Sequence, residues 1–129
     1  MTISHFSFPT TIHFGAGASK MAGVHLRERG LRRPLIVTDK ALAALPVMKR
    51  FAAHLDTGLD FGIFHGVQGN PTASQVMAGQ AAYKAHRADC VIGFGGGAAL
   101  DVAKVVALMA VHDGHVMEYV WDHPQVKPI

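Results

Sequence analysis

The sequence predicts an α/β fold, in which a Rossmann-like parallel sheet is flanked by helices and residues 1–129 form one domain. Two observations carry this prediction. Between residues 31 and 94, short apolar runs alternate with longer helix-compatible segments, a pattern typical of βα units around a parallel sheet. Half of the 129 residues are hydrophobic, so the chain can bury one core, whereas a second full domain does not fit.

The first elements are expected before residue 40. Thr10–Phe14 alternates like a strand, and Ser19–Arg29 has a helical pattern that Gly30 closes. Leu35–Thr38 is the clearest strand, because it is apolar or β-branched throughout, as expected of a strand buried on both faces.

The alternation of strand and helix continues after this strand. A helical region is expected from Lys40 to Leu55, with Pro46 opening its second part as a first-turn proline. The apolar run Leu59–Phe64 predicts the next strand.

A capping signal marks the following helix. Thr72 and Gln75 form a capping-box pair, which places a helix start near Ala73. The run Cys90–Phe94 predicts a third strand, and a last helix is expected from about Ala98 to Val111.

Three consecutive glycines, Gly95 to Gly97, stand between the third strand and the last helix. Consecutive glycines indicate positive φ angles or a close approach to the backbone. At this position the backbone N–H groups are unpaired and lie at the positive end of the helix dipole, which favours a phosphate group. The sequence therefore predicts a phosphate site here; the alternative is a tight turn without a ligand.

An acidic residue, Asp39, follows the strand Leu35–Thr38. The carboxyl ends of parallel strands meet at one edge of a sheet, so Asp39 and the glycines can line one crevice. A carboxylate there can accept both ribose hydroxyls of an adenosine and repels a 2′-phosphate, which favours NAD over NADP. The alternative role of Asp39 is the N-cap of the following helix.

Asp101 and Lys104 are polar exceptions on a last helix that is otherwise apolar all round. Because buried charges must be paired, we interpret them as a structural ion pair. The second interpretation is a polar contact from this helix to a nucleotide or substrate.

The charge pattern argues against a nucleic-acid partner, and the hydropathy pattern against a membrane partner. The net charge is +3, and the basic run Arg27–Arg33 is short, contains a glutamate and fits a solvated helix end better than a nucleic-acid surface. No apolar stretch reaches the roughly 18 residues that span a bilayer, and the N-terminus lacks the features of a signal peptide. We therefore expect a cytoplasmic protein with no nucleic-acid or membrane partner.

The histidines and the cysteine give no catalytic or metal site. His112, His115 and His123 have ligand-like spacing, but they fall in an expected loop without a helix to fix their geometry, so we interpret them as surface histidines. The single cysteine, Cys90, lies in an apolar strand and is interpreted as a small buried core residue.

Four segments together resemble the N-terminal half of the iron-containing (group III) alcohol dehydrogenases: Phe14–Gly17, Val37–Lys40, Asn70–Thr72 and Gly95–Lys104. The resemblance covers nearly the whole chain, with the motifs in the right order. It implies an N-terminal nucleotide-binding domain like that of the related dehydroquinate synthases. Glycerol dehydrogenases and maleylacetate reductases are similar, although Asp101 and Lys104 fit the alcohol dehydrogenases better.

The resemblance also implies roles for individual residues. It places Asp39 on the adenosine ribose, the backbone at Gly96, Gly97 and Ala98 on the pyrophosphate, and Asn70 close to the nucleotide. Family members commonly carry serine where this chain has Ala98, so one hydroxyl contact to the cofactor is missing. We also include two residues among the expected cofactor-binding residues: Gly95, as the first glycine of this loop, and Asp101, through the second interpretation given above.

In the whole enzyme, the resemblance implies hydride transfer between NAD(H) and a small alcohol or aldehyde, with Fe²⁺ or sometimes Zn²⁺ held by a C-terminal helical domain. We expect this chain to be a fragment that stops before that metal-binding domain, is inactive alone, and forms a homo-oligomer through exposed apolar surface. The alternatives are a non-catalytic nucleotide-binding or oligomerisation module, or a relative of the maleylacetate reductases or glycerol dehydrogenases.

Overall fold

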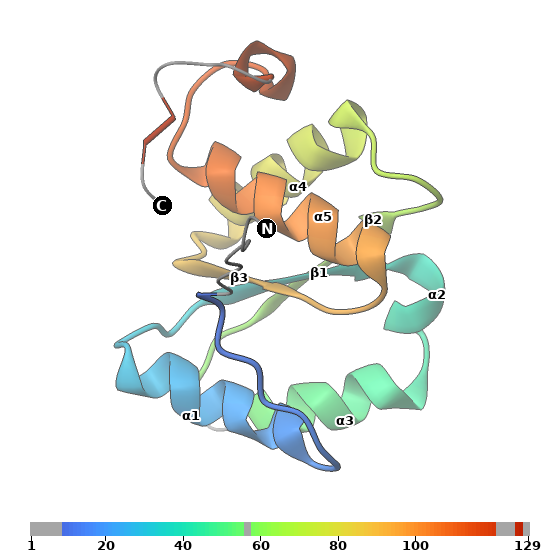
Figure 1. Ribbon diagram of the computed structural model, residues 1–129, viewed down its shortest axis with the longest axis vertical. Helices are drawn as coiled ribbons and strands as arrows, with labels where there is room; N and C mark the ends of the chain where they lie inside the picture. The colour runs from blue at the N-terminus through green and yellow to red at the C-terminus, as the bar shows by residue number, and fades with distance from the viewer. Residues whose placement is uncertain (1–8, 56–57, 121–125, 128–129) are drawn as a thin grey trace, which may run out of the picture.

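Three parallel strands lie between two layers of helices in the computed structural model, which describes residues 9–55, 58–120 and 126–127 (Figure 1). The predicted fold class is confirmed. The strands are β1 (Pro34–Asp39), β2 (Gly62–Val67) and β3 (Cys90–Gly93). The α-helices are α1 (Met21–Glu28), α2 (Lys40–Ala43), α3 (Pro46–Leu55), α4 (Ala73–His86) and α5 (Gly97–Ala110), with short 3-10 helices η1 (Ala18–Lys20) and η2 (Val116–Tyr119).

The strand order is β2-β1-β3, and both outer strands run parallel to β1. Ile36 at the centre of β1 is in register with Ile63 on one side and Ile92 on the other. The chain therefore leaves β1 toward β2 and then crosses to the opposite side of β1 to form β3. In open α/β sheets, such a reversal leaves a crevice at the carboxyl ends of the two strands that flank it.

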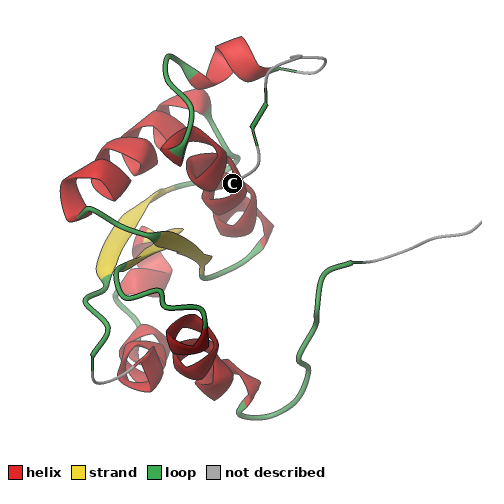
Figure 2. Cartoon of the chain, turned by 90° about the vertical axis from the view of Figure 1, so that its left-hand side faces the viewer, coloured by secondary structure: helices red, strands yellow, loops and turns green. Residues whose placement is uncertain are grey.

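Alternate residues of β1 pack against the two helical layers, which lie above and below the sheet in Figure 2. Leu35 and Val37 belong to a buried cluster with residues of α4 and α5. Ile36 belongs to a second cluster, with Phe51 and Leu55 of α3. Because β1 is buried on both faces, its apolar sequence needs no alternation, as predicted.

The helix ends follow the predicted signals closely. Gly30 has a φ of 73° after α1, and the Leu31 N–H donates to the Leu26 carbonyl, which is the pattern of a Schellman motif. The Thr72 side chain caps α4 by accepting from the Gln75 N–H. No helix in the described ranges is both long and apolar enough to cross a bilayer.

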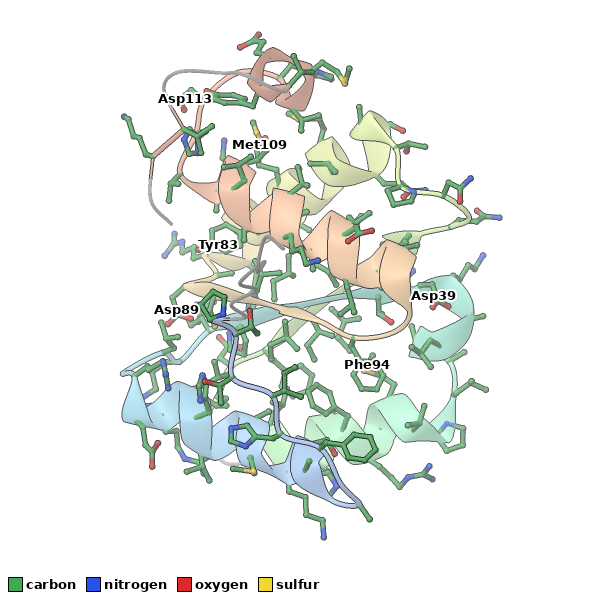
Figure 3. The ribbon with its side chains drawn as sticks, in the orientation of Figure 1. Asp39, Tyr83, Asp89, Phe94, Met109 and Asp113 are labelled. Carbon is green, nitrogen blue, oxygen red and sulfur yellow. The ribbon has the colours of Figure 1, made fainter. Side chains whose placement is uncertain are left out.

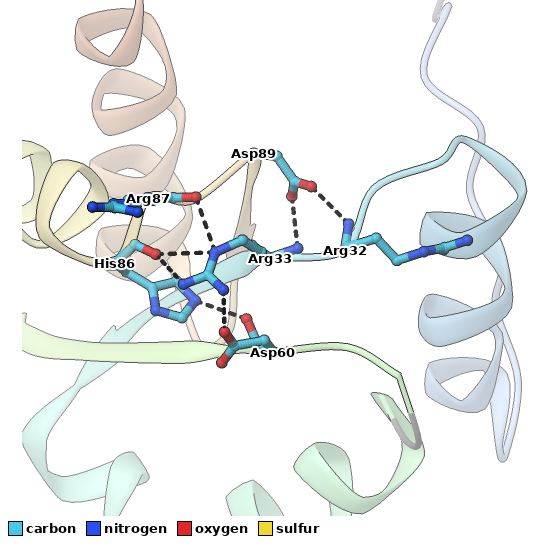
Figure 4. Close-up of polar contacts among 6 residues, drawn as sticks. All are labelled: Arg32, Arg33, Asp60, His86, Arg87 and Asp89. Carbon is cyan, nitrogen blue, oxygen red and sulfur yellow. Dashed lines mark hydrogen bonds and ion pairs between the residues drawn. The ribbon is translucent and has the colours of Figure 1, made fainter.

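A group of polar residues closes the amino-terminal edge of the sheet (Figure 4). The Arg33 guanidinium pairs with the Asp60 carboxylate and donates to the His86 carbonyl at 2.7 Å. Asp89 accepts from the backbone N–H groups of Arg32 and Arg33 at 2.7 and 3.0 Å. Arg32 and Arg33 therefore connect the start of β1 to the segment before β2 and to the end of α4. The positive charge of Arg33 lies at the C-terminus of α4, and not at the C-terminus of α1 as the sequence suggested.

One predicted strand is wrong. Thr10–Phe14 is a loop away from the sheet (Figure 2), and its apolar side chains are exposed, Ile12 by 77% and Phe14 by 100%. A strand needs a partner to satisfy its backbone. Among the described residues, this segment pairs with neither of the outer strands, β2 and β3.

The second predicted strand is shifted. β2 begins at Gly62 and ends at Val67, rather than spanning Leu59–Phe64. Leu59 and Phe61 are apolar for another reason, because they pack against the Ile36 cluster before the chain enters the sheet. The shift matters for function because it moves the end of β2, and the turn after it, to the carboxyl edge of the sheet.

Candidate functional site

A cleft of about 790 Å³ lies at the carboxyl edge of the sheet. Segments that follow all three strands contribute to it, and Figure 1 shows α2, the end of β2 and the start of α5 on the same side of the molecule. Its lining consists of Asp39, Lys40, Ala41, Val67, Gln68, Gly69, Gly96, Gly97, Ala98 and Ala99. The structure thus brings Asp39 and the glycine segment, far apart in the sequence, to one crevice.

The N-terminus of α5 leaves backbone donors free at this cleft. The first N–H in the helix to find a carbonyl is that of Leu100, which donates to Gly96 at 3.1 Å. Within the described part of the chain, the N–H groups of Gly97, Ala98 and Ala99 have no hydrogen-bond partner. The N-cap, Gly96, has no side chain to satisfy them, so the positive end of the helix dipole faces the cleft unneutralised.

The other two helices that begin at this edge are different. Asp39 caps α2 and Thr72 caps α4, each through a side-chain oxygen. Helix α5 has no side-chain cap because its N-cap residue is a glycine, whereas the N-cap residues of the other two helices are an aspartate and a threonine. An uncapped, 14-residue helix whose first amides border a cleft is suited to bind an anionic group.

Of the three glycines, Gly95 is the one whose conformation excludes a side chain. Its φ is 142°, and a Cβ at this position would lie 3.1 Å from the Ala99 Cβ and 3.2 Å from the Leu42 Cδ2. A Cβ on Gly96 or Gly97 would meet no atom within 4 Å. The predicted positive φ is therefore confirmed at Gly95. At Gly96 and Gly97, the space next to the backbone is open on the side of the cleft.

Asp39 caps a helix and also lines the cleft. Its Oδ1 accepts the Leu42 N–H at 2.7 Å, which makes it the N-cap of α2. It also lines the cleft, and Figure 3 shows it at the end of β1 on the side where α5 begins. The capping bond uses one carboxylate oxygen and holds the side chain in place.

The predicted ion pair between Asp101 and Lys104 is confirmed, but the expectation that it is buried is wrong. The two side chains form an ion pair at 3.3 Å, but they are 62% and 75% exposed. Leu100 beside them is also exposed, so the outer face of α5 is open to solvent despite its apolar sequence. An exposed pair of this spacing stabilises a helix by only about 0.2–0.5 kcal/mol.

Three of the predicted site residues are outside the cleft lining. Asn70 is exposed in the turn after Gly69, and Gly95 is exposed in the loop before α5, where a Cβ would lie 3.7 Å from Asp39 Oδ2. Asp101 lies one turn further along α5 than Ala98. Conversely, sequence analysis missed Lys40, Val67, Gln68 and Gly69, which do line the cleft. The missing signal was the end of β2: a strand extended to Val67 places the following turn at this edge.

The described residues contain no group of three or more His, Cys, Asp or Glu side chains that could hold a metal ion. His112 is buried, at 6% exposure, rather than on the surface; its Nδ1 lies 2.7 Å from the Leu108 carbonyl oxygen. His123 lies outside the described residues. Cys90 is half-buried, and burial followed by the neighbouring Asp89 raises the pKa of its thiol to about 12, which leaves it a poor nucleophile.

Residues 9–129 match the sequence profile of the family described as iron-containing alcohol dehydrogenase. The chain belongs to the iron-containing alcohol dehydrogenase family. The resemblance inferred from the four motifs is confirmed, and the match covers all the elements of the fold.

Individual members of the iron-containing alcohol dehydrogenase family are similar along most of this chain. An NAD-dependent methanol dehydrogenase from Bacillus methanolicus is 31% identical over 128 residues, which is 98% of this chain and 34% of the relative. A 4-hydroxybutyrate dehydrogenase from Cupriavidus necator is 36% identical over 110 residues, 85% of this chain and 28% of the relative. The solved structure of NADH-dependent butanol dehydrogenase A from Thermotoga maritima superposes with a TM-score of 0.81 at 25% identity, covering 97% of this chain and 32% of that protein. This chain therefore spans about a third of the length of these relatives.

Proposed function

We propose that this domain binds NAD(H) in the cleft at the carboxyl edge of the sheet. The observation that carries the proposal is the meeting of two groups there: the unpartnered amides at the start of α5 and the carboxylate of Asp39. Amides at a helix N-terminus suit a diphosphate, and a carboxylate suits the hydroxyls of a ribose. Relatives named as NAD-dependent or NADH-dependent dehydrogenases support this choice of nucleotide.

In this proposal, the backbone at Gly96, Gly97 and Ala98 binds the pyrophosphate, and Asp39 binds the adenosine ribose. Gly95 lets the loop pass close to Asp39, because a side chain there would collide with Ala99 and Leu42. Asn70 and Asp101, which are outside the cleft lining, are proposed to contact the nucleotide further from the diphosphate.

The whole protein is proposed to transfer a hydride between NAD(H) and a small alcohol or aldehyde, as an oxidoreductase of its family. Fe²⁺ or Zn²⁺ would polarise the alcohol oxygen in that reaction. The described residues do not fit such an ion, so we place its ligands outside them and assign no step through the metal to these side chains. What this chain contributes is the binding and orientation of the nucleotide.

Titration calorimetry with NAD and with ADP-ribose tests the proposal. ADP-ribose retains the diphosphate and the adenosine ribose, so it is expected to bind with an affinity close to that of NAD. Absence of heat with both compounds, together with an unchanged melting temperature, would contradict nucleotide binding by this domain.

A catalytic assay tests whether this chain alone can carry out the hydride transfer. With NAD, added Fe²⁺ and a short-chain alcohol, this chain alone is expected to bind without producing NADH. Turnover would show that the metal ligands are present after all. Light scattering on the same sample tests the proposed homo-oligomer.

A further inference from the structure

The cleft has a second wall, opposite the start of α5, formed by the turn that follows β2. Gln68 and Gly69 of this turn line the cleft, and Gly69 has a φ of 62°. Val67 pairs with Asp39 across the sheet, so the turn begins directly beside the carboxylate. Its conformation therefore sets the shape of the cleft at the Asp39 end.

A single side chain holds this turn. In the part of the chain that the structure describes, the one hydrogen bond made by residues 68–70 runs from Gln75 Nε2 to the Gln68 carbonyl oxygen, at 2.7 Å. The turn makes no backbone hydrogen bond of its own there. Without Gln75, no hydrogen bond from the described residues would hold residues 68–70 between the end of β2 and the start of α4.

The orientation of the Gln75 amide is not the one that its sequence position predicts. As the third residue of α4 in a capping box, its side chain is expected to return to the backbone N–H of Thr72. Instead the side chain reaches away from the helix to Gln68, and its Oε1 is buried with no partner among the described residues. A flipped amide would place two acceptors, Oε1 and the Gln68 carbonyl, against each other, so the contact with Gln68 decides the orientation.

We propose that Gln75 is a positioning residue of the nucleotide cleft, which fixes the Gln68–Gly69 wall against the start of α4. The inference rests on the proposed function of the cleft. Gln75 itself is not a lining residue, so it acts through the turn. Since the turn adjoins Asp39, the affinity for ADP-ribose and for NAD should depend on Gln75 to the same extent.

Gln75→Glu is a sharp test because it separates positioning from stability. The variant keeps the shape of the side chain but places a carboxylate oxygen against the Gln68 carbonyl, which breaks the bond. At the third position of α4 a carboxylate completes the capping box and complements the helix dipole, so the melting temperature is expected to stay the same or rise. The affinity for NAD and ADP-ribose is expected to fall about 2- to 10-fold, the range for one neutral hydrogen bond.

Ser74→Glu is the matched control. Ser74 is exposed one residue earlier in the same helical turn, so this variant adds the same charge at the same helix end and leaves the Gln75–Gln68 contact intact. An equal loss of affinity in Ser74→Glu would assign the effect to charge repulsion of the diphosphate and would overturn the positioning role.

A measurement without nucleotide keeps the two proposals apart. The ¹⁵N order parameter of Gly69 in the free domain is expected to fall in Gln75→Glu and to remain unchanged in Ser74→Glu. An unchanged order parameter in Gln75→Glu would overturn the inference even if NAD binds. A lower order parameter in Gln75→Glu with unchanged affinity would overturn the link between the turn and nucleotide binding. Wild-type protein that binds no NAD would overturn the proposed function itself.

Discussion

The carboxylate of Asp39 accepts the Leu42 N–H through Oδ1 at 2.7 Å, and a Cβ built on Gly95 would lie 3.7 Å from its other oxygen, Oδ2. One side chain therefore caps α2 and borders the glycine loop that leads into α5. The N-cap bond fixes the carboxylate at the cleft before any ligand arrives. The two interpretations of Asp39 from sequence are thus compatible, since a carboxylate has two oxygens.

Asp39→Asn separates the two roles. Asparagine is as good an N-cap as aspartate, so the unfolding free energy should change by less than about 0.5 kcal/mol. The substitution removes the negative charge of the Asp39 side chain, and with it a repulsion of about 1–4 kcal/mol between that carboxylate and the 2′-phosphate of NADP. We expect the ratio of NADP to NAD affinity to rise at least about fivefold, measured by calorimetry with both nucleotides. An unchanged ratio with unchanged stability would remove the ribose role from Asp39.

Ala98→Ser restores a hydroxyl at a position that lines the cleft. Because one neutral hydrogen bond contributes about 0.5–1.5 kcal/mol, NAD is expected to bind about two- to tenfold more tightly. ADP-ribose should gain the same factor, since the proposed contact is with the diphosphate. Ala99→Ser is a natural comparison on the same helical turn; an equal gain there would indicate a general polar effect of the cleft.

The parts of the fold that sequence predicted well are those in which a local pattern and a tertiary environment agree. β1 was clear because a strand buried on both faces is apolar at every position. The start of α4 was clear because Thr72 makes its capping bond within one turn. The convergence of Asp39 with the glycines was predictable from parallel strand order alone.

The errors arose where the outcome depends on partners distant in sequence. Alternation in Thr10–Phe14 resembles a strand, but the pattern does not show whether the segment pairs with a sheet edge, and among the described residues it does not. The apolar sequence of α5 concealed the exposure of Asp101. Gln75 satisfied a capping-box pattern, yet its side chain contacts a turn seven residues earlier, so the second wall of the cleft could be seen only in the structure.

Two of the three glycines, Gly95 and Gly97, are expected to respond differently to alanine. Gly95→Ala forces a side chain into a positive φ with contacts of 3.1 and 3.2 Å, so we expect a loss of about 1–3 kcal/mol in the unfolding free energy. Gly97→Ala meets open space at the first position of α5 and should gain about 0.4–1 kcal/mol, because alanine restricts the unfolded chain and favours the helix. Urea unfolding of the pair measures both, and equal effects would contradict this assignment.

The last prediction concerns acid stability and the opposite edge of the sheet. Burial alone would raise the pKa of Asp89, but the backbone N–H donors of Arg32 and Arg33 outweigh it and hold the pKa below its usual value. The folded protein therefore binds the proton less readily than the unfolded chain. This contribution to stability is complete above the unfolded pKa, about 4, and is lost as the pH falls from there through the lower pKa of the folded state.

Asp89→Asn removes that pH dependence while keeping one oxygen to accept a backbone N–H. We expect the variant to be less stable than wild type at pH 7, and the difference in unfolding free energy to shrink as the pH falls below about 4. Urea titrations at pH 7, 4 and 3 measure it. Asp113→Asn serves as the control, because in the described residues the Asp113 carboxylate accepts no hydrogen bond. A difference between Asp89→Asn and wild type that stays constant across these pH values would show that the two bonds at Asp89 act through geometry and not through charge.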